Sequence, residues 1–163
     1  MSDPLLPLPE DRAAGTGRPA WRTWVLVVGV TAVLTFGLMQ LVPYRISNPS
    51  VRHEPTWNSA QTRELAVRAC YDCHSNEVKT PWYGQVAPVS WWLNSHVQDG
   101  RAALNFSDWQ GPGGEGAQEA ARTVVDGSMP PTYYTLFGLH HTAKLTAAER
   151  AELAAGLQVS LSH

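Results

Sequence analysis

The sequence predicts an all-α protein in which a single N-terminal transmembrane helix precedes a compact helical domain. Three observations lead to this fold class. Residues 24–42 form an uncharged apolar run, later stretches carry apolar residues at helical spacing, and no stretch shows convincing strand-like alternation. The chain has 163 residues, so one span leaves one domain of about 100 to 120 residues.

Composition excludes several classes of protein. Charged residues make up 16% of the chain, below the roughly 25% of a typical soluble protein. The 12 basic and 14 acidic residues give no excess of positive charge, so we do not expect a nucleic-acid partner. Cys70 and Cys73 are the two cysteines of the chain, which excludes a disulfide-rich scaffold.

Residues 24–42 are long enough to cross a bilayer once. As a helix they span roughly 28 Å, close to the hydrocarbon thickness of about 30 Å. A cleaved signal peptide has an apolar core of about 7 to 15 residues and a small-x-small cleavage site, whereas this run leads into Pro-Tyr-Arg-Ile. We therefore expect an uncleaved signal anchor, and the alternatives are a cleaved signal and a buried helix of a soluble protein.

Flanking charges predict the orientation of this span. The N-terminal flank carries Arg12, Arg18 and Arg22, and the C-terminal flank carries Arg45 and Arg52. Positive residues favour the cytoplasmic side, so three against two places the N-terminus inside. The protein is then a single-pass protein of the cytoplasmic membrane, with its domain on the extracytoplasmic side.

Prolines and charges divide the remainder of the chain. Residues 1–23 carry four Pro, two Gly and no apolar period, which predicts a disordered cytoplasmic tail. Residues 43–55 hold three prolines and little to bury, which predicts a stiff, mostly extended tether. Residues 56–163 form the domain.

Four helices are predicted in this domain. Ser59 is a suitable N-cap for the first, and Gly100 weakens the last turn of the second. The sequence GPGGEG at 111–116 predicts a loop, and Gly127 can end the third helix at C′. The helices are expected at 59–69, 89–104, 117–125 and 147–161.

The last of these helices has the strongest signals. Thr146 and Glu149 have the spacing of a capping box. Ala154, Leu157 and Leu161 then fall on one stripe of the helix. We expect this stripe to face the core.

Residues 70–74 read Cys-Tyr-Asp-Cys-His, which is the spacing of c-type haem attachment. Thiols at Cys70 and Cys73 can each form a thioether with one haem vinyl group, and His74 can then bind the iron from below. A structural zinc site would need four ligands and would recruit His140 and His141. A redox dithiol expects a βαβ setting that this helical chain lacks.

A second axial ligand can be sought among the methionines. Met1 starts the chain and Met39 lies in the span, so Met129, in Gly-Ser-Met-Pro-Pro, is the available thioether. The two prolines restrict its backbone, which helps to hold a weak donor in place. Methionine more often fills a gap in a core. The rival possibilities for the sixth position are His96, His140, His141 and an open site.

Aromatic residues are abundant between this motif and the segment after Met129. Most of them are expected to build the core of so small a domain, although several should line a flat apolar cofactor. We select Trp82 and Trp91 as pocket residues, with His96 and Arg101 as candidates for the haem propionates. The aromatic residues are Trp82, Tyr83, Trp91, Trp92, Phe106, Trp109, Tyr133 and Tyr134.

These motifs resemble the membrane-anchored haem-binding domain family of small c-type cytochrome-like proteins. The resemblance covers residues 57–158 and is carried by CYDCHSNEVKTPWYGQVAPVSWWLNSHVQDGRAALNFSDW, SMPPTYY and LTAAERAEL. It implies a cytochrome c-like helical fold, one haem c attached at Cys70 and Cys73, His74 as proximal ligand, and Met129-Pro-Pro as a distal ligand loop. It also implies haem attachment outside the cytoplasm.

The expected function is single-electron transfer between membrane or periplasmic redox partners. A His/Met iron has no free site for a substrate, and methionine ligation raises the potential. Residues 46–163 carry 8 basic and 11 acidic residues, which suggests a basic docking face on the partner. The alternatives are a peroxidase-like haem enzyme and a haem sensor or accessory subunit of a respiratory complex.

Overall fold

The computed structural model describes residues 20–42, 44–109, 114–136 and 140–162, with side chains undescribed at 114–117. Residues 1–19 of the predicted tail at 1–23 lie outside the described residues. Residues 111–113 of the predicted loop at 111–116 also lie outside them. The chain divides into two compact units, Met1–Leu41 and Val42–His163. In the described ranges both units are helical, so the predicted all-α class is confirmed.

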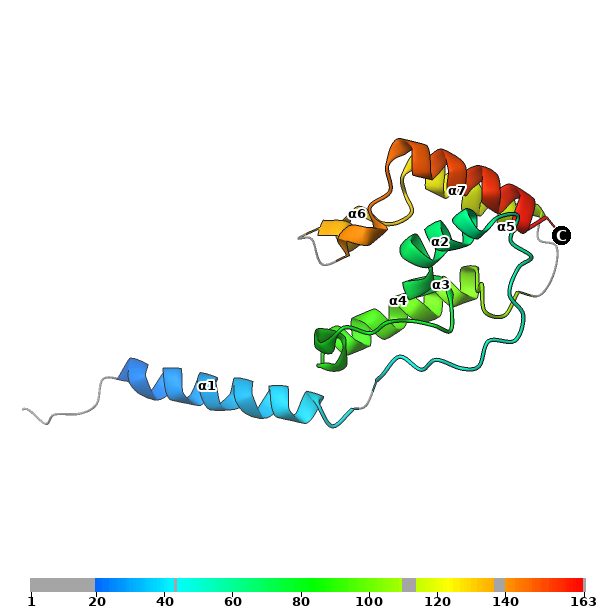
Figure 1. Cartoon of the computed structure of the whole chain (residues 1–163). Coiled ribbons are helices and arrows are strands. Elements are labelled where there is room, and N and C mark those ends of the chain that lie inside the picture. The colour runs from blue at the N-terminus through cyan, green and yellow to red at the C-terminus, as the bar shows by residue number, and fades with distance from the viewer. Residues whose placement is uncertain (1–19, 43, 110–113, 137–139, 163) are drawn as a thin grey trace, which may run out of the picture. The chain divides into compact units, whose positions relative to one another are not determined.

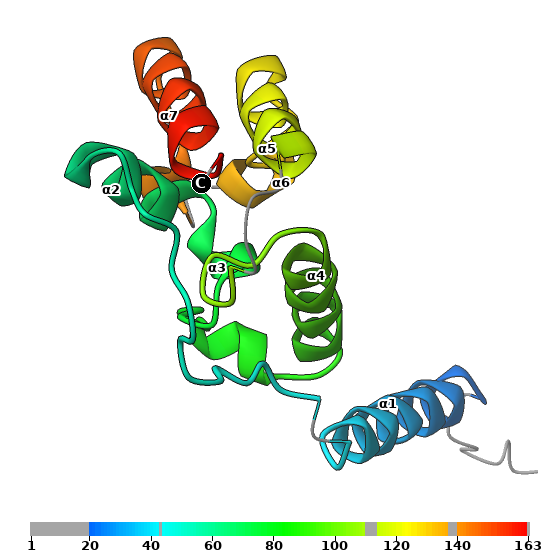
Figure 2. The same cartoon turned by 90° about the vertical axis from the view of Figure 1, so that its right-hand side faces the viewer.

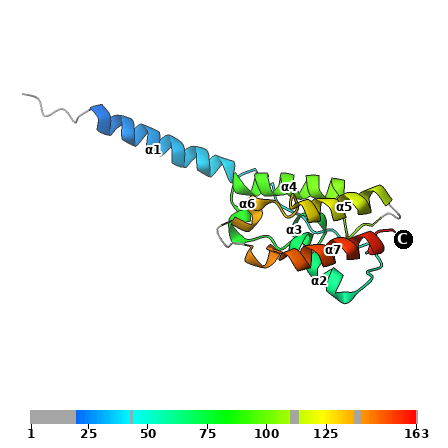
Figure 3. The ribbon, with the colours of Figure 1, turned by 90° about the horizontal axis from the view of Figure 1, so that it is seen from above.

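The first unit contains α1 (Ala20–Met39), one unbroken helix (Figures 1 and 3). Its 20 residues span about 30 Å, and it is long and apolar enough to cross a membrane. It begins four residues before the predicted span and ends three residues before its predicted end at 42. The predicted bounds were those of the uncharged run, whereas the helix is defined by its backbone hydrogen bonds and therefore includes Arg22.

Three helices form an apolar layer of the second unit. In this layer α7 packs along α5 and also against α2 (Figure 2). The helices are α2 (Ala60–Ala69), α5 (Gly114–Asp126) and α7 (Ala147–Ser160). The fully buried leucines are Leu65, Leu153, Leu157 and Leu161, which confirms the inward stripe predicted for the last helix.

The helix ends in this layer follow the local signals of the sequence. The Ser59 hydroxyl accepts a hydrogen bond from the backbone N–H of Thr62, and Thr146 and Glu149 form the predicted capping box. Gly127 follows α5 with φ of 82°, a left-handed conformation that favours glycine. α5 itself begins at Gly114, earlier than predicted, because two glycines disfavour a helix without preventing one.

A second group of elements surrounds the Cys-x-x-Cys-His sequence. Its main helix is α4, which ends one residue before its predicted end, and both α3 and η1 pack against it. The short helices α3 and α6 and the 3-10 turns η1 and η3 were not predicted. The elements are α3 (Tyr71–His74), η1 (Trp82–Gln85), α4 (Val89–Ala103), α6 (Thr132–Thr135) and η3 (His141–Ala143).

The segment predicted as a tether has no regular secondary structure over residues 44–52, but it is hydrogen-bonded to the domain. The Arg101 guanidinium donates to the Ser47 carbonyl at 2.9 Å and to Asn48 Oδ1 at 3.2 Å. Further along, the backbone N–H of Trp109 donates to the His53 carbonyl at 2.9 Å. The compact unit therefore begins well before residue 56. The sequence did not predict this start, because hydrogen bonds to backbone groups leave no apolar pattern in the sequence.

Candidate functional site

The Cys-x-x-Cys-His sequence folds as one helical turn, α3, joined to the end of α2. The Cys70 N–H donates to the Ala66 carbonyl and so closes α2. The N–H groups of Cys73 and His74 then both donate to the Cys70 carbonyl, at 3.1 and 2.9 Å. Cys70 leaves the helical conformation, with φ of −122°, so it ends one helix and begins the next.

The His74 imidazole is oriented by a backbone carbonyl. Its Nδ1 lies 3.0 Å from the Leu104 carbonyl oxygen, which can only accept, so Nδ1 carries the proton and Nε2 keeps its lone pair. Burial lowers the pKa of His74 against the opposing effect of the Leu104 and Gly100 carbonyls. A neutral ring held through Nδ1 is the usual state of a metal-binding histidine.

The two thiols are free and partly buried. Burial raises the pKa of Cys70 to about 12, and the neighbouring Cys73 adds to the effect. Burial also raises the pKa of Cys73, with a contribution from Asp72. Both side chains are therefore protonated thiols at neutral pH while no metal is bound.

In the described part of the chain, the histidines that the alternative zinc site would recruit do not gather with the two thiols. Within the described ranges of the chain, no group of three or more His, Cys, Asp or Glu side chains could hold a metal ion. His140 is engaged elsewhere, because its ring stacks on Tyr134 at 4.1 Å and its Nε2 lies 3.2 Å from the Tyr83 hydroxyl.

Gly100 allows α4 to pack directly on the Cys-x-x-Cys-His sequence. A Cβ atom at this position would lie 2.5 Å from the carbonyl oxygen of Cys73 and 3.2 Å from its Cβ. The sequence suggested only a weak helical turn at Gly100. Its contact with α3 shows that the glycine serves close packing beside the two thiols.

The segment that carries Met129 reaches the same region through two tyrosines. The Tyr134 hydroxyl donates to Oδ2 of Asp72 at 2.5 Å, inside the attachment motif. Burial raises the pKa of Tyr133, and the nearby Cys73 acts in the same direction. This segment therefore lies against α3.

Met129 is held by its backbone on both sides. Its N–H donates to the Thr123 carbonyl at 2.9 Å, and its carbonyl accepts from Nη1 of Arg150 at 3.1 Å. The residue is 37% exposed. The residue is thus not part of the buried core, and whether its sulfur reaches a cofactor stays a prediction.

The other predicted pocket residues lie at different places around α4. His96 Nδ1 donates to the Trp92 carbonyl at 2.9 Å, and its ring lies 6.0 Å from that of Tyr133. Trp91 donates from Nε1 to the Val42 carbonyl at 3.2 Å. Trp82 is 79% exposed. Whether these residues touch a cofactor stays a prediction.

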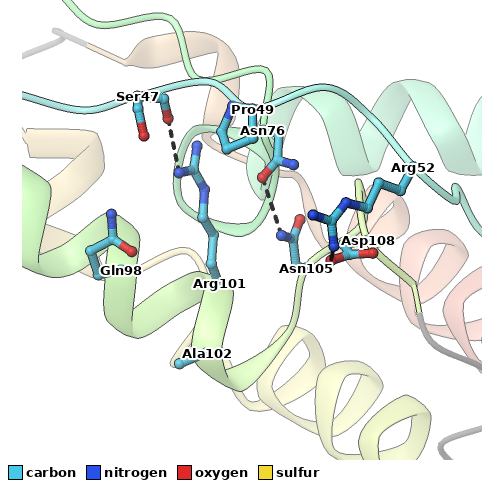
Figure 4. Close-up of a pocket in the computed structure, with 9 residues that line it drawn as sticks. All are labelled: Ser47, Pro49, Arg52, Asn76, Gln98, Arg101, Ala102, Asn105 and Asp108. Carbon is cyan, nitrogen blue, oxygen red and sulfur yellow. Dashed lines mark hydrogen bonds and ion pairs between the residues drawn. The ribbon is translucent and has the colours of Figure 1, made fainter.

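Arg101 lies beside a polar cavity of about 360 Å³ at the surface. Figure 4 shows its guanidinium directed toward Ser47, with the Asn76–Asn105 and Arg52–Asp108 pairs along the same wall. Its Nε also donates to the Ser75 carbonyl at 2.7 Å. Arg101 thus joins the segment before the domain to the residue after His74, and its predicted role toward a propionate is untested.

Two contributors to this site, the Leu104 carbonyl and Asp72, were not predicted. The Leu104 carbonyl is a backbone group, so no side-chain pattern points to it. Asp72 is an unspecified position of the motif, and its bond to Tyr134 joins residues 62 apart. The tyrosine pair in SMPPTYY was visible as part of the resemblance, but its partner was not.

Two thiols and an oriented imidazole lie together at one helical turn inside a helical unit, and such a donor set suits a haem-binding protein. Comparison with known families supports this class, because residues 34–159 match the family described as "Haem-binding domain". The match covers well over half of the chain, so the chain belongs to this family. No curated protein and no solved structure matches the chain.

Proposed function

We propose that this protein is a membrane-tethered c-type cytochrome with one haem, which carries single electrons between redox partners. The observation that carries the proposal is the α3 turn, where His74 Nδ1 is bonded to the Leu104 carbonyl one residue after the second thiol. This arrangement leaves Nε2 for iron beside both attachment points. The residues present therefore fit a haem.

Three side chains would hold the cofactor. Cys70 and Cys73 would each add an S–H across one vinyl C=C, so that a C–S bond forms and the proton goes to the other vinyl carbon. His74 would bind the iron through Nε2. The bound haem supplies reversible one-electron exchange. The protein contributes attachment, ring orientation and exclusion of water.

Met129 is our proposed sixth ligand. Its support is the fixed backbone between the Thr123 and Arg150 contacts and the placement of the following tyrosines against α3. A thioether ligand closes the iron to substrates and favours the ferrous state. Such a site suits electron transfer.

The proposed location is the cytoplasmic membrane, with α1 as a single span and the haem domain on the extracytoplasmic side. The support is the length and composition of α1 together with the excess of arginine on the N-terminal flank. Thioether attachment of haem outside the cytoplasm, implied by the family resemblance, agrees with this orientation.

Covalent attachment tests the central part of the proposal. After acid-acetone extraction and denaturing electrophoresis, the full-length chain should keep its haem stain. Cys73→Ala should weaken or abolish the stain, whereas Glu77→Gln, an exposed change just beyond the motif, should leave it unchanged. A chain that carries stoichiometric zinc and no haem would overturn the proposal.

Carbon monoxide binding tests the sixth ligand and separates an electron carrier from an enzyme. The reduced wild type should bind carbon monoxide poorly, and Met129→Ala should bind it readily and lose the weak far-red absorption of a Met–iron bond. Met39→Ala, in the span, is the matched control and should behave as wild type. If the wild type binds carbon monoxide rapidly, a haem enzyme or sensor is the better assignment.

A further inference from the structure

An uncharged, aromatic surface lies at the start of α4. Residues 80–95 contain no Asp, Glu, Lys or Arg and include three tryptophans. In the structure this stretch forms η1 and the first half of α4. Trp82 is 79% exposed and Val89, the first residue of α4, is 40% exposed. We refer to η1 and residues 86–92 together as the aromatic end of the domain.

This aromatic end is tied to the beginning of the second unit. Trp91 donates from Nε1 to the carbonyl of Val42 at 3.2 Å, and Val42 is the first residue of that unit. Val42 also follows the last residue of α1 by only three positions. If α1 spans the bilayer, the Val42 carbonyl lies near the membrane–water interface. The start of α4 must then lie near it too.

The chemistry of this end suits a lipid headgroup region. Tryptophan and tyrosine are enriched at that depth, because their rings are amphipathic. Tyr44, which is 56% exposed, precedes Arg45, and a basic residue there can meet lipid phosphates. A protein-binding surface usually has a polar rim around its apolar centre, whereas charged residues are absent over 80–95.

We propose that the aromatic end docks on the headgroup region of the bilayer that α1 spans, with Trp82 and Val89 in contact with lipid. The proposal rests on the membrane anchor of the proposed function. It assigns Trp82 to lipid in place of the haem pocket. Docking of this kind orients the haem domain toward membrane-bound redox partners.

Photo-crosslinking to lipid tests this surface in the full-length holoprotein. The chain is reconstituted in nanodiscs of phosphatidylcholine and phosphatidylglycerol, with p-benzoylphenylalanine in place of Trp82 or Val89. The same probe in place of Val125 or Val159, which are exposed apolar residues of α5 and α7, provides matched controls. We expect lipid adducts by mass spectrometry at positions 82 and 89 and none at 125 and 159.

The remaining outcomes overturn the proposal in distinguishable ways. Equal labelling at all four positions, or no labelling at positions 82 and 89, overturns the docking. The anchor of the proposed function still holds in that case if the chain resists extraction by alkaline carbonate. Adducts to another protein at position 82 in native membranes also overturn it, in favour of a protein partner. A chain that carbonate releases overturns the anchor and the docking together.

Discussion

The two halves of the second unit differ in the mix of side chains that they bury. The α2, α5 and α7 layer buries fully enclosed leucines and has capped helices. Around α3 and α4, by contrast, the buried side chains include Ser75, Asn76, Ser90 and Asn94. These elements are joined by hydrogen bonds to backbone groups and by the close contact at Gly100.

This difference predicts where a bound cofactor would add most to the stability of the domain. The leucine layer supplies its own apolar core, which is the dominant favourable contribution to folding. The α3 and α4 half holds its elements in position but leaves Trp92 and the nearby Tyr133 about half exposed. We expect a flat apolar ligand to supply part of the apolar contact in this half.

Truncating the leucine layer should have the largest effect on stability. Leu157 is 1% exposed, so Leu157→Ala should lower the free energy of unfolding by roughly 3 kcal/mol through lost burial and a cavity. The measurement is urea unfolding of the full-length protein in detergent, followed by circular dichroism. The optical spectrum of the folded holoprotein should not change, because Leu157 belongs to the other half.

Val159→Ala is the control for this change, because Val159 lies on α7 with 49% exposure. It should alter stability by less than about 1 kcal/mol. Equal losses from the two variants would show that the leucine layer is not the stabilising half.

A smaller effect is expected where α4 meets the attachment motif. Gly100→Ala places a methyl group 2.5 Å from the Cys73 carbonyl oxygen, which forces α4 away at a cost of about 2 kcal/mol. The gain of about 1 kcal/mol in helix propensity offsets only part of this cost. The measurement is the yield of covalently bound haem per chain, together with urea unfolding.

The yield should fall for Gly100→Ala and stay at the wild-type value for Ser95→Ala, an exposed change on the same helix. A Gly100→Ala protein with unchanged haem yield and greater stability would mean that propensity outweighs the contact. The close packing of α4 on α3 would then have no role in attachment.

Removing the Arg101 contacts should have a local effect. Arg101→Gln loses hydrogen bonds to Ser47 and Ser75, at about 1 to 2 kcal/mol. Amide exchange at residues 44–52 should become faster in the full-length protein, while exchange in α7 stays unchanged. Arg52→Gln is the control, since the Arg52 side chain is 67% exposed in its pair with Asp108 and such pairs contribute little.

The smallest effect concerns acid. The Thr146 backbone N–H and Arg68 hold the pKa of Glu149 at about 2, below its usual 4.5. The carboxylate therefore stabilises the fold above about pH 4.5, and this contribution is lost as the pH falls toward 2. As the pH falls through this window, the melting temperature of the wild type should decrease more steeply than the melting temperature of Glu149→Gln. Glu64→Gln should retain the wild-type dependence.

The sequence predicted those parts of the fold whose signals are local. Ser59 and the Thr146–Glu149 pair mark helix starts within four residues, and the leucine spacing of α7 marks its buried face. Short elements such as α6 and η3 carry too few residues for a period. The bonds of the segment before the domain run to backbone carbonyls, so its docking was not predicted.

The candidate site divides in the same way. The spacing of Cys70, Cys73 and His74 was sufficient to expect a haem motif, and the family match supports a haem protein. The Leu104 carbonyl and the Asp72–Tyr134 bond depend on long-range folding. Gly100 was visible, but its reason, contact with Cys73, required the tertiary structure.

In the proposed electron carrier, the contacts at the start of the second unit also limit how far from the membrane the haem can exchange electrons. Only two residues, 40 and 41, separate the end of α1 from Val42, whose carbonyl accepts a hydrogen bond from Trp91. Fully extended they reach roughly 7 Å. In the proposed anchored protein, this short connection gives the domain a high effective concentration for partners in the same bilayer. A freely diffusing carrier has no such advantage, so the short connection favours a membrane-bound redox partner.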